Sequence, residues 1–372
     1  PTQYRVMIMR ILWITARSFT DLCSTTQQAL IYGLLNDGFE VQLINGDEHV
    51  PVEHDGFVHT TLSRSSRKGF QASSLANNMV QWLEQNQLDS SKTIAVVEWR
   101  VGRRIAPILN RLGIRWMLMD RSPPADTGLF GWLQWRSWKK AWSIARDRDV
   151  LGFVVSPAHK RFVDLKIGHK KTSILPAGVD MNLFKPMKKH EVLTMVYHGR
   201  LDRHRGIMAV VMLVHKAHQG GVEINLKLIG EGDATADLRS IASEVDYIEV
   251  KDKMEQTKVA REIAACHIGI LPMPERTAWV LASPLKRSEY LASGLCVFGV
   301  DHEGHRLDQE KPWFVLAAQD NFHRDGLEYL NNFNFQDNTQ FQEVRAFAEQ
   351  YCGWDEAITN LKDGIHLIMA DS

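Results

Sequence analysis

Short apolar runs alternate with helical patterns along the first half of the chain. The runs predict strands at Arg10–Ala16, Glu40–Ile44, Thr93–Glu98, Arg115–Met119 and Leu151–Ser156. A helix is expected over about residues 25–37, between the first two strands. Strands that alternate with helices in this way usually pair in parallel, so the pattern predicts a doubly wound α/β sheet.

The same rhythm restarts after Pro176. Further strands are expected at Thr194–His198, Glu223–Gly230, Tyr247–Val250, Ile268–Pro272 and Cys296–Gly299, with a helix from Gly206. Pro, Gly and Lys residues interrupt the pattern over Pro176–Pro186, where we expect the joint. A chain of 372 residues is long enough for two domains, so we predict two α/β domains in series.

Composition indicates a folded globular protein with an uneven charge distribution. Apolar residues make up 44% of the chain and the formal net charge is zero. Residues 1–180 carry an excess of seven positive charges and residues 181–372 an equal negative excess. The basic excess is concentrated in residues 99–171, which would attract phosphate-bearing partners or an anionic membrane surface. An ordinary solvated basic face is the alternative.

The cysteines and the apolar runs narrow the expected compartment. Cys23, Cys266, Cys296 and Cys352 lack the spacing of a disulfide framework or zinc site, which favours a reducing, cytoplasmic environment. No apolar run approaches the roughly 18 residues needed to cross a bilayer, and no signal peptide is recognisable at the amino terminus.

Five motifs follow one another in the second half of the chain. They are Ile174–Asp180 with Phe184–Pro186, His198–Leu201 with Arg205 and Gly206, Leu228–Gly232, Ser283–Lys286 with Glu289–Gly294, and Gly353–Asp355. In this order they resemble the retaining family 4 of glycosyltransferases (glycosyltransferase group 1), which have the GT-B fold. Residues 1–170 are similar to that family mainly in overall pattern.

The resemblance implies two Rossmann-like domains facing across a cleft. Residues 1–178 would form the acceptor-side domain and residues 179–354 the domain that binds a nucleotide sugar. It also implies that the C-terminal helix, residues 355–372, joins the first domain.

Two arginines are expected to contact a diphosphate. Arg200 ends a predicted strand and Arg205 precedes a predicted helix, so both guanidinium groups can meet phosphate near a helix N-terminus. The family usually has Lys where Arg205 stands, and Arg keeps the charge while adding bidentate reach. A pair of surface ion-pairing arginines is the alternative.

The Ser-Pro-Leu-Lys segment supplies the other expected donor contacts. Lys286 and Glu289 are three residues apart, so on a helix that begins near Pro284 they share a face. The resemblance makes Lys286 a phosphate or sugar contact and Glu289 the acceptor for the ribose hydroxyls, with Pro284 and Leu285 beside the donor. A solvent-exposed salt bridge between Lys286 and Glu289 is the alternative.

Two further features bear on the sugar and the nucleotide. The family's commoner form has another glutamate eight positions before Glu289, but this chain has Leu281 there. Glu275 is the nearest alternative acid for the sugar hydroxyls. Gly230 and Gly232 form a glycine-rich turn after a strand, which would let backbone approach the nucleotide.

The first domain offers candidates on its loops. Ser24 or Thr25 could leave the N-terminal amides of a helix free for phosphate, or simply cap that helix. Asp120 ends a strand where related enzymes often place an acid or histidine facing the acceptor, although a capping role is the alternative. Trp99 and Arg100 lie on the same predicted rim.

A helix over Leu129–Arg148 carries four tryptophans on one arc. These are Trp132, Trp135, Trp138 and Trp142, whereas the aliphatic residues Leu129, Leu133 and Ile144 occupy a separate arc. With basic residues such as Lys139 beside the tryptophans, we expect the aliphatic arc to face the core and the tryptophan arc to face a membrane headgroup layer. Burial of the tryptophans within the domain is the alternative.

Together these features predict a retaining hexosyltransferase that uses a UDP- or GDP-sugar. Its expected catalytic residues are Arg200, Arg205, Lys286 and Asp120. The acceptor would be a lipid-linked or membrane-surface glycan, at the inner face of the membrane, with a soluble small molecule or polysaccharide as the alternative. We expect no metal, no other cofactor and no nucleic-acid partner. A nucleotide-sugar epimerase and a catalytically silent nucleotide-sugar-binding protein are the alternative functions.

Overall fold

A computed structural model describes residues 9–19, 24–67, 69–124 and 128–370. The chain divides into two compact units. The first consists of residues 1–176 and 354–372, and the second consists of residues 177–353. The division falls two residues before the expected boundary at residue 178.

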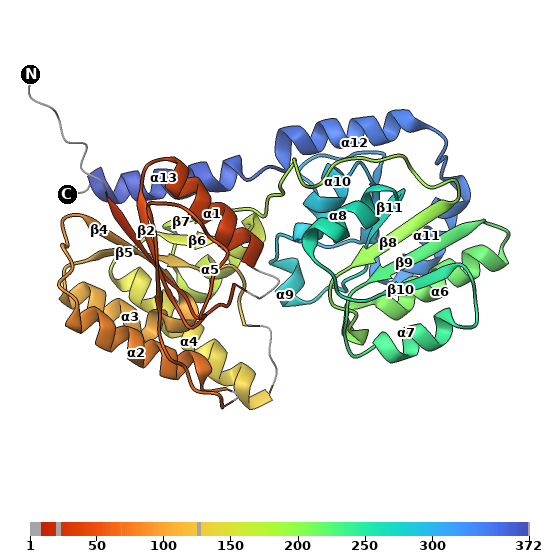
Figure 1. Cartoon of the computed structure of the whole chain (residues 1–372). Helices are drawn as coiled ribbons and strands as arrows, with labels where there is room; N and C mark the ends of the chain where they lie inside the picture. Colours follow the sequence, from red (N-terminus) through yellow and green to blue (C-terminus); the bar gives the residue numbers. More distant parts are fainter. Residues whose placement is uncertain (1–8, 20–23, 68, 125–127, 371–372) are drawn as a thin grey trace, which may run out of the picture. The chain divides into compact units, whose positions relative to one another are not determined.

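The first unit contains a parallel sheet of seven strands (Figure 1). The strands are β1 (Arg10–Ile14), β2 (Glu40–Asn45), β3 (Phe57–Thr61), β4 (Thr93–Glu98), β5 (Arg115–Met119), β6 (Gly152–Val154) and β7 (Thr172–Ile174). Their spatial order is β3-β2-β1-β4-β5-β6-β7. Because side chains alternate across each strand, the sheet buries apolar residues on both faces.

Helices cover both faces of this sheet. They are α1 (Ser24–Asn36), α2 (Gln71–Gln85), α3 (Trp99–Arg111), α4 (Gly128–Asp147), α5 (Pro157–Ile167) and α13 (Asp355–Ala370). Helices α2, α3, α4 and α5 pack on one face, and α1 and α13 pack on the other. The C-terminal helix α13 is tied to this unit by Asn360, whose amide donates to the carbonyl of Ile174, and by an ion pair between Lys362 and Asp37.

The second unit contains a parallel sheet of six strands. They are β8 (Leu193–His198), β9 (Ile224–Ile229), β10 (Ile248–Lys251), β11 (Ile268–Leu271), β12 (Cys296–Val300) and β13 (Phe314–Ala317), in the spatial order β10-β9-β8-β11-β12-β13. The surrounding helices are α6 (Ile207–Gln219), α7 (Thr235–Ala242), α8 (Gln256–Ala264), α9 (Thr277–Val280), α10 (Leu285–Ala292), α11 (Phe322–Asn332) and α12 (Asn338–Tyr351). Two 3-10 turns, η1 (Arg203–Arg205) and η2 (Gln319–Asn321), complete the unit.

Strand order reverses once in each sheet, between β1 and β4 and between β8 and β11. In open parallel sheets, ligands bind outside the carboxyl ends of the strands at such a switch point. The loops that follow these four strands are therefore the positions at which a site is expected in each unit.

The predicted doubly wound α/β architecture is confirmed in both units. The sequence analysis did not predict β3, β7 or β13. Strand β7 has only three residues, and β3 and β13 are edge strands with half-exposed side chains that lack a continuous apolar run. Within the described residues, no helix is both long enough and apolar enough to cross a membrane.

The expected orientation of helix α4 is wrong, because most of the tryptophan arc faces the core and the two leucines of the aliphatic arc face solvent. Trp138 and Trp142 are fully buried and Trp135 is half-buried, whereas Leu129 and Leu133 are exposed. The large indole rings gain more from burial than leucine does, and two of them also find a hydrogen-bond partner inside the unit. Only Trp132 of the four tryptophans is largely exposed.

Candidate functional site

The loop after β8 carries both predicted arginines. Arg200 is the second residue after the strand, and Arg205 ends the turn η1 just before α6. Gly206 between them and the helix has a φ of 79°, and a Cβ atom there would lie 2.3 Å from the carbonyl oxygen of Pro272. Glycine at 206 thus allows the loop after β8 to pack against the loop after β11, at the switch point of the sheet.

The glycine-rich turn after β9 packs against the same loop. A Cβ atom on Gly230 would lie 1.8 Å from the carbonyl oxygen of Gly199, and one on Gly232 would lie 2.3 Å from the backbone of Leu201. Leu201 N–H donates to the carbonyl of Glu231 at 2.9 Å, which fixes the two loops together. The structure therefore supplies a reason for these glycines that the sequence analysis did not consider, namely contact between two loops.

Asp202 lies at the centre of the predicted phosphate-binding loop. It is 5% exposed, and its carboxylate accepts hydrogen bonds from the Arg200 guanidinium at 3.0 and 3.2 Å. Arg205 Nε lies 3.5 Å from the same carboxylate. Burial acts to raise the pKa of Asp202, but the Arg200 hydrogen bonds, the backbone N–H of Asp233 and the charges of both arginines hold it below its usual value. A charged Asp202 therefore orients both arginines.

Tyr197 links Lys286 to this loop. The ammonium nitrogen of Lys286 lies 5.3 Å from the centre of the Tyr197 ring, and its aliphatic chain lies beside Gly199. The Tyr197 hydroxyl donates to the carbonyl of Arg200 at 3.1 Å. Burial raises the pKa of Tyr197 to about 12, although the charge of Arg205 opposes that rise. Tyr197 thus contacts Lys286 through its ring and the arginine loop through its hydroxyl, while Asp202 holds both guanidinium groups.

Glu289 lies one helical turn beyond Lys286 on α10. It is buried, and one carboxylate oxygen lies 3.0 Å from Nε2 of His198, the last residue of β8. Gln256 donates to the other oxygen at 3.5 Å. Burial acts to raise the pKa of Glu289, but His198, Lys286 and Gln256 together hold it below its usual value. The predicted ribose contact is consequently a carboxylate, and the charge of Lys286 is among the groups that stabilise its ionised form.

Aromatic contacts surround the arginine loop on one side. Trp279 of α9 stacks on His204 with ring centres 5.7 Å apart and an angle of 13° between the planes. The guanidinium carbon of Arg205 lies 5.9 Å from the Trp279 ring, and that of Arg276 lies 5.4 Å from it. These cation–π contacts restrict the directions in which Arg205 can point.

The remaining predicted donor contacts lie on the segment before α10. Pro284 immediately precedes the helix and Leu285 is its first residue, both half-buried. Leu281 is 5% exposed and belongs to the hydrophobic interior. Glu275 is exposed in the loop after β11, and its backbone N–H donates to Gln319 at 2.9 Å.

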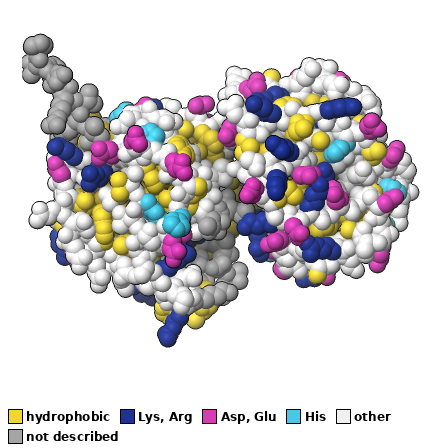
Figure 2. Space-filling model, viewed as in Figure 1, with side chains coloured by type: hydrophobic (Ala, Val, Ile, Leu, Met, Phe, Trp, Pro, Cys, Tyr) yellow, Lys and Arg dark blue, Asp and Glu magenta, His cyan; other side chains and the backbone are white. Residues whose placement is uncertain are grey.

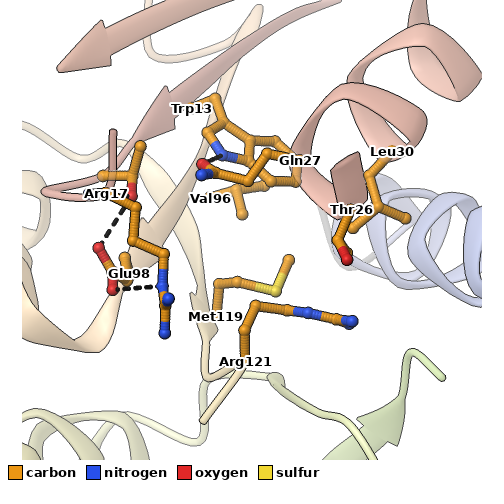
Figure 3. Close-up of a pocket in the computed structure, with 10 residues that line it drawn as sticks. Trp13, Arg17, Thr26, Gln27, Leu30, Val96, Glu98, Met119 and Arg121 are labelled. Atoms are coloured by element: carbon orange, nitrogen blue, oxygen red, sulfur yellow. Dashed lines mark hydrogen bonds and ion pairs between the residues drawn. The ribbon is translucent and has the colours of Figure 1, made fainter. Parts of the chain in front are cut away.

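A small pocket lies at the switch point of the first sheet (Figure 3). Arg17 from the loop after β1 pairs with buried Glu98 at 3.2 Å, and Arg100 pairs with the same carboxylate. Met119 and Arg121, from β5 and the loop after it, line the pocket between this pair and helix α1 (Figure 3). Burial acts to raise the pKa of Glu98, but the charges of Arg100 and Arg17 hold it below its usual value.

The expectation that Asp120 faces the acceptor is wrong. Its side chain is fully buried, and a single carboxylate oxygen, Oδ2, accepts the indole N–H of Trp138 at 2.6 Å and that of Trp142 at 2.9 Å. Nε2 of buried His159 lies 3.2 Å from the same oxygen. Asp120 is therefore a structural residue that joins α4 and α5 to the carboxyl end of β5.

Other residues of the expected acceptor wall also differ from expectation. Trp99 is buried, and its indole N–H donates to the carbonyl of Ser122 at 2.9 Å, so the ring does not form an exposed rim. Arg100 is half-buried against it. Ser24 and Thr25 are half-buried in the first turn of α1. Residues 20–23 of the preceding loop lie outside the described residues.

Within the described ranges, no group of three or more His, Cys, Asp or Glu side chains has an arrangement that could hold a metal ion. Lys139 is exposed on α4, and Asp149 pairs with Lys171 at 3.0 Å.

No protein-family model and no curated protein matches the chain. Among solved structures, sucrose-phosphate synthase from Thermosynechococcus elongatus superposes with a TM-score of 0.77 at 14% identity, covering 98% of this chain and 100% of that one. Anabaena HepE in complex with UDP gives 0.72 at 12% identity, covering 96% and 100%. The chain has the GT-B fold.

A third solved structure is similar over nearly the whole chain. The pneumococcal O-GlcNAc transferase GtfA, in complex with UDP and GlcNAc, gives a TM-score of 0.71 at 10% identity and covers 97% of this chain and 99% of that one. Likeness at such low identity establishes the fold, and function has to be argued from the site.

Several residues of the site were not singled out in the sequence. Asp202, Tyr197, His198 and Trp279 all contact a predicted residue. Asp202 could have been found from its spacing, because an acid two residues after Arg200 and three before Arg205 is placed to orient both. Trp279 carries no such signal, since its contact with Arg205 depends on how the loops after β8 and β11 fold together.

Proposed function

We propose that the chain is a retaining glycosyltransferase of family 4, which transfers a hexose from a nucleoside-diphosphate sugar to an acceptor hydroxyl. The observation that carries the proposal is that Asp202 holds Arg200 and Arg205, and that Lys286 lies on the adjoining Tyr197 ring, at the switch point of the second sheet. Three cations near the carboxyl ends of the strands suit a ligand with two phosphates.

The proposed chemistry requires stabilisation of a leaving diphosphate. Departure of the nucleoside diphosphate leaves a sugar with oxocarbenium character and builds negative charge on the phosphate oxygens. Arg200, Arg205 and Lys286 would stabilise that charge, a task that metal ions perform in other enzymes. Because Asp202 and Trp279 already orient the arginines, little reorganisation is needed at the moment of bond cleavage.

Glu289 would bind the ribose of the donor. Its carboxylate has acceptor capacity beyond the contacts with His198 and Gln256, and a vicinal diol can donate two hydrogen bonds to one carboxylate. Anabaena HepE was solved with UDP and with UDP-glucose, and GtfA with UDP and GlcNAc. We therefore propose UDP-sugars as the first donors to test, with GDP-sugars as the alternative.

For the acceptor we propose a hydroxyl of a lipid-linked or membrane-surface glycan. The support is the basic excess of the first unit and the exposed residues at the start of α4. Transfer to a soluble sugar or polysaccharide is the competing possibility, and assays with each acceptor class distinguish them.

The proposal is tested by replacing Lys286 or Arg205 with Ala. Each change should reduce transfer on the order of 10²–10³-fold, because one charge that stabilises the leaving group is lost. Lys258→Ala, an exposed lysine on α8 in the same unit, is a matched control that should leave transfer unchanged. Near-normal transfer by Lys286→Ala would refute the assignment.

Two measurements separate this function from the alternatives. Incubation of the donor without acceptor should give no epimerised sugar, whereas an epimerase would produce one. Glu289→Gln should weaken UDP binding, by about tenfold for one lost hydrogen bond to a charged group, and calorimetry measures this directly. A protein that binds UDP yet transfers to no glycan or lipid extract would instead be a silent binding protein.

A further inference from the structure

An apolar patch remains in solvent where helix α4 begins. Leu129 is 70% exposed, Trp132 is 56% exposed and Leu133 is 47% exposed, although all three are large apolar residues. Helix α4 turns its other side, with Trp138 and Trp142, into the core. These exposed residues therefore cannot be explained as part of the interior of the unit.

Phe130 and Phe70 extend the patch beyond α4. Phe130 is 50% exposed, and a Cβ atom on Gly69 would lie 2.4 Å from its ring, so the loop that precedes α2 lies against it. Phe70, next in that loop, is 63% exposed. We call the whole set the apolar tip, which consists of Phe70, Leu129, Phe130, Trp132 and Leu133.

Such a cluster is unusual on a protein surface. Isolated exposed apolar side chains are common, but contiguous ones mark a contact with another molecule or a membrane. In Figure 2, hydrophobic side chains come to the surface at the lower end of the first unit, where α4 begins in Figure 1, with Lys or Arg side chains close by.

Basic side chains continue along the same face of α4. Arg136, Lys139 and Lys140 are exposed, and the guanidinium carbon of Arg136 lies 5.5 Å from the Trp132 ring. Most of helices α2, α3 and α4 lacks acidic residues. Twelve Lys or Arg and no Asp or Glu occur in the ranges that contribute these parts, residues 62–83, 99–119 and 128–146.

The acidic residues of α2 and α4 lie at the ends of these helices that are far from the apolar tip. Asp147 ends α4, and at 1.5 Å per residue it is about 25 Å from Leu129 along the helix axis. Glu84 is about 20 Å from Phe70 along α2 by the same rise, and it pairs with Arg111. Asp126 precedes α4 in the sequence, outside the described residues. The exposed face of α4 is therefore basic as well as apolar.

We propose that the apolar tip docks the protein on an anionic membrane surface. Trp, Phe and Leu side chains would enter the boundary between headgroups and acyl chains, and the basic residues behind them would meet anionic lipid headgroups. A protein partner fits less well, because lysine is depleted in the cores of protein interfaces. The docking surface uses the opposite side of α4 from the tryptophans that fill the core.

Co-sedimentation with vesicles tests the apolar part of the proposal. The full chain should sediment with vesicles of equal parts phosphatidylcholine and phosphatidylglycerol. Leu129→Ser with Leu133→Ser should weaken binding by about tenfold, because two partly inserted leucines are lost. Leu165→Ser with Met212→Ser is the matched control, since these residues are 85% and 52% exposed elsewhere on the surface, and it should bind like the wild type.

Charge reversal tests the electrostatic part. Arg136→Glu with Lys140→Glu should weaken binding to anionic vesicles by at least about tenfold, and added salt should weaken wild-type binding. Lys216→Glu with Lys258→Glu, at exposed positions of the second unit, is the matched control. Both tests are independent of transfer activity, so failure here leaves the proposed hexose transfer intact and removes only the support for a membrane-surface acceptor.

Three results would overturn docking on a membrane. The first is that the wild type does not sediment with anionic vesicles at low salt. The second is that the tip variants bind as tightly as their controls. The third is that the wild type forms a dimer but never binds vesicles, and that the variant Leu129→Ser with Leu133→Ser no longer forms the dimer.

Discussion

The buried carboxylate of Asp120 offers a sharp test of the structure, because a catalytic role had been expected from the sequence. Oδ2 accepts two indole N–H groups and lies near His159, whereas Oδ1 is buried without a hydrogen-bond partner among the described residues. Asp120→Asn keeps the shape of the side chain and removes its charge. The amide oxygen can take the place of Oδ2, which leaves the amide nitrogen buried at the position of Oδ1.

The expected loss of stability follows from these contacts. A hydrogen bond to a charged group contributes about 1.5–3 kcal/mol and a neutral one about 0.5–1.5 kcal/mol, so three weakened contacts cost about 3 kcal/mol. The buried amide nitrogen, which has no partner, lowers stability further. This loss is offset because the variant no longer buries a charge. For a domain of this size, about 3 kcal/mol lowers Tm by about 6–12 °C.

Thermal unfolding followed by tryptophan fluorescence measures the change, since Trp138 and Trp142 report on this site directly. Asp149→Asn is the matched control. Asp149 is exposed beside Lys171 and has a φ of 50°, a conformation that Asn tolerates, so its Tm should change little. An unchanged Tm for Asp120→Asn combined with lost transfer would refute the structural role and restore the catalytic one.

The effect of Asp120 also has a defined pH dependence. Burial acts to raise its pKa, but His159 and the two indole N–H groups hold the pKa below its usual value. A carboxyl with a depressed pKa stabilises the folded state above the unfolded pKa of about 3.9 and loses that contribution as pH falls through the folded value. The Tm difference between wild type and Asp120→Asn should therefore be full near neutral pH and shrink below about pH 4.

Two further predictions concern the second unit. Gly232→Ala should destabilise the second unit by about 1–3 kcal/mol and abolish the rise in Tm on adding UDP, because the new Cβ would lie 2.3 Å from the Leu201 backbone. Gly56→Ala is the control, since a Cβ there would have its nearest neighbours at 3.5 Å, and it should change neither quantity. Burial lowers the pKa of Lys189 to about 8, so this lysine holds its proton more tightly in the unfolded chain than in the folded one. The free energy of unfolding should therefore rise as pH increases from about 8 to about 10. Urea unfolding should show this rise in the wild type and not in Lys189→Met, and an identical rise in both would contradict the assignment.

Much of the second unit's site could be predicted from local sequence. Parallel strands covered on both faces appear as short apolar runs, and the loops that follow such strands carry the ligand contacts. Arg200 and Arg205 were placed in this way, whereas the roles of Lys286 and Glu289 were implied by the resemblance of their motif. The structure holds both arginines on Asp202 and places Lys286 over the Tyr197 ring. Their predicted roles in the donor complex remain predictions.

Helix α4 shows where local sequence was insufficient. Its periodicity defined two apolar arcs, but the structure divides each of them, because Trp132 is exposed while Ile144 packs against the core. The choice of core-facing residues depended on Asp120, Trp138 and Trp142. The nearer of the two tryptophans, Trp138, is 18 residues from Asp120 in the sequence, so these side chains meet only when β5 and α4 pack together. Burying both indole rings and satisfying a buried carboxylate outweighs burying Leu129 and Leu133.

The sequence by itself determined most of the strands, the doubly wound fold class and the loop on which Arg200 and Arg205 lie, because these depend on periodicity and on residues close together in the chain. Only the tertiary structure decided that Asp120 is structural, that Asp202 orients both arginines, and that the exposed apolar side of α4 is the one with Leu129 and Trp132. Those outcomes depend on burial and on contacts between distant segments, and burial is a property of the folded chain.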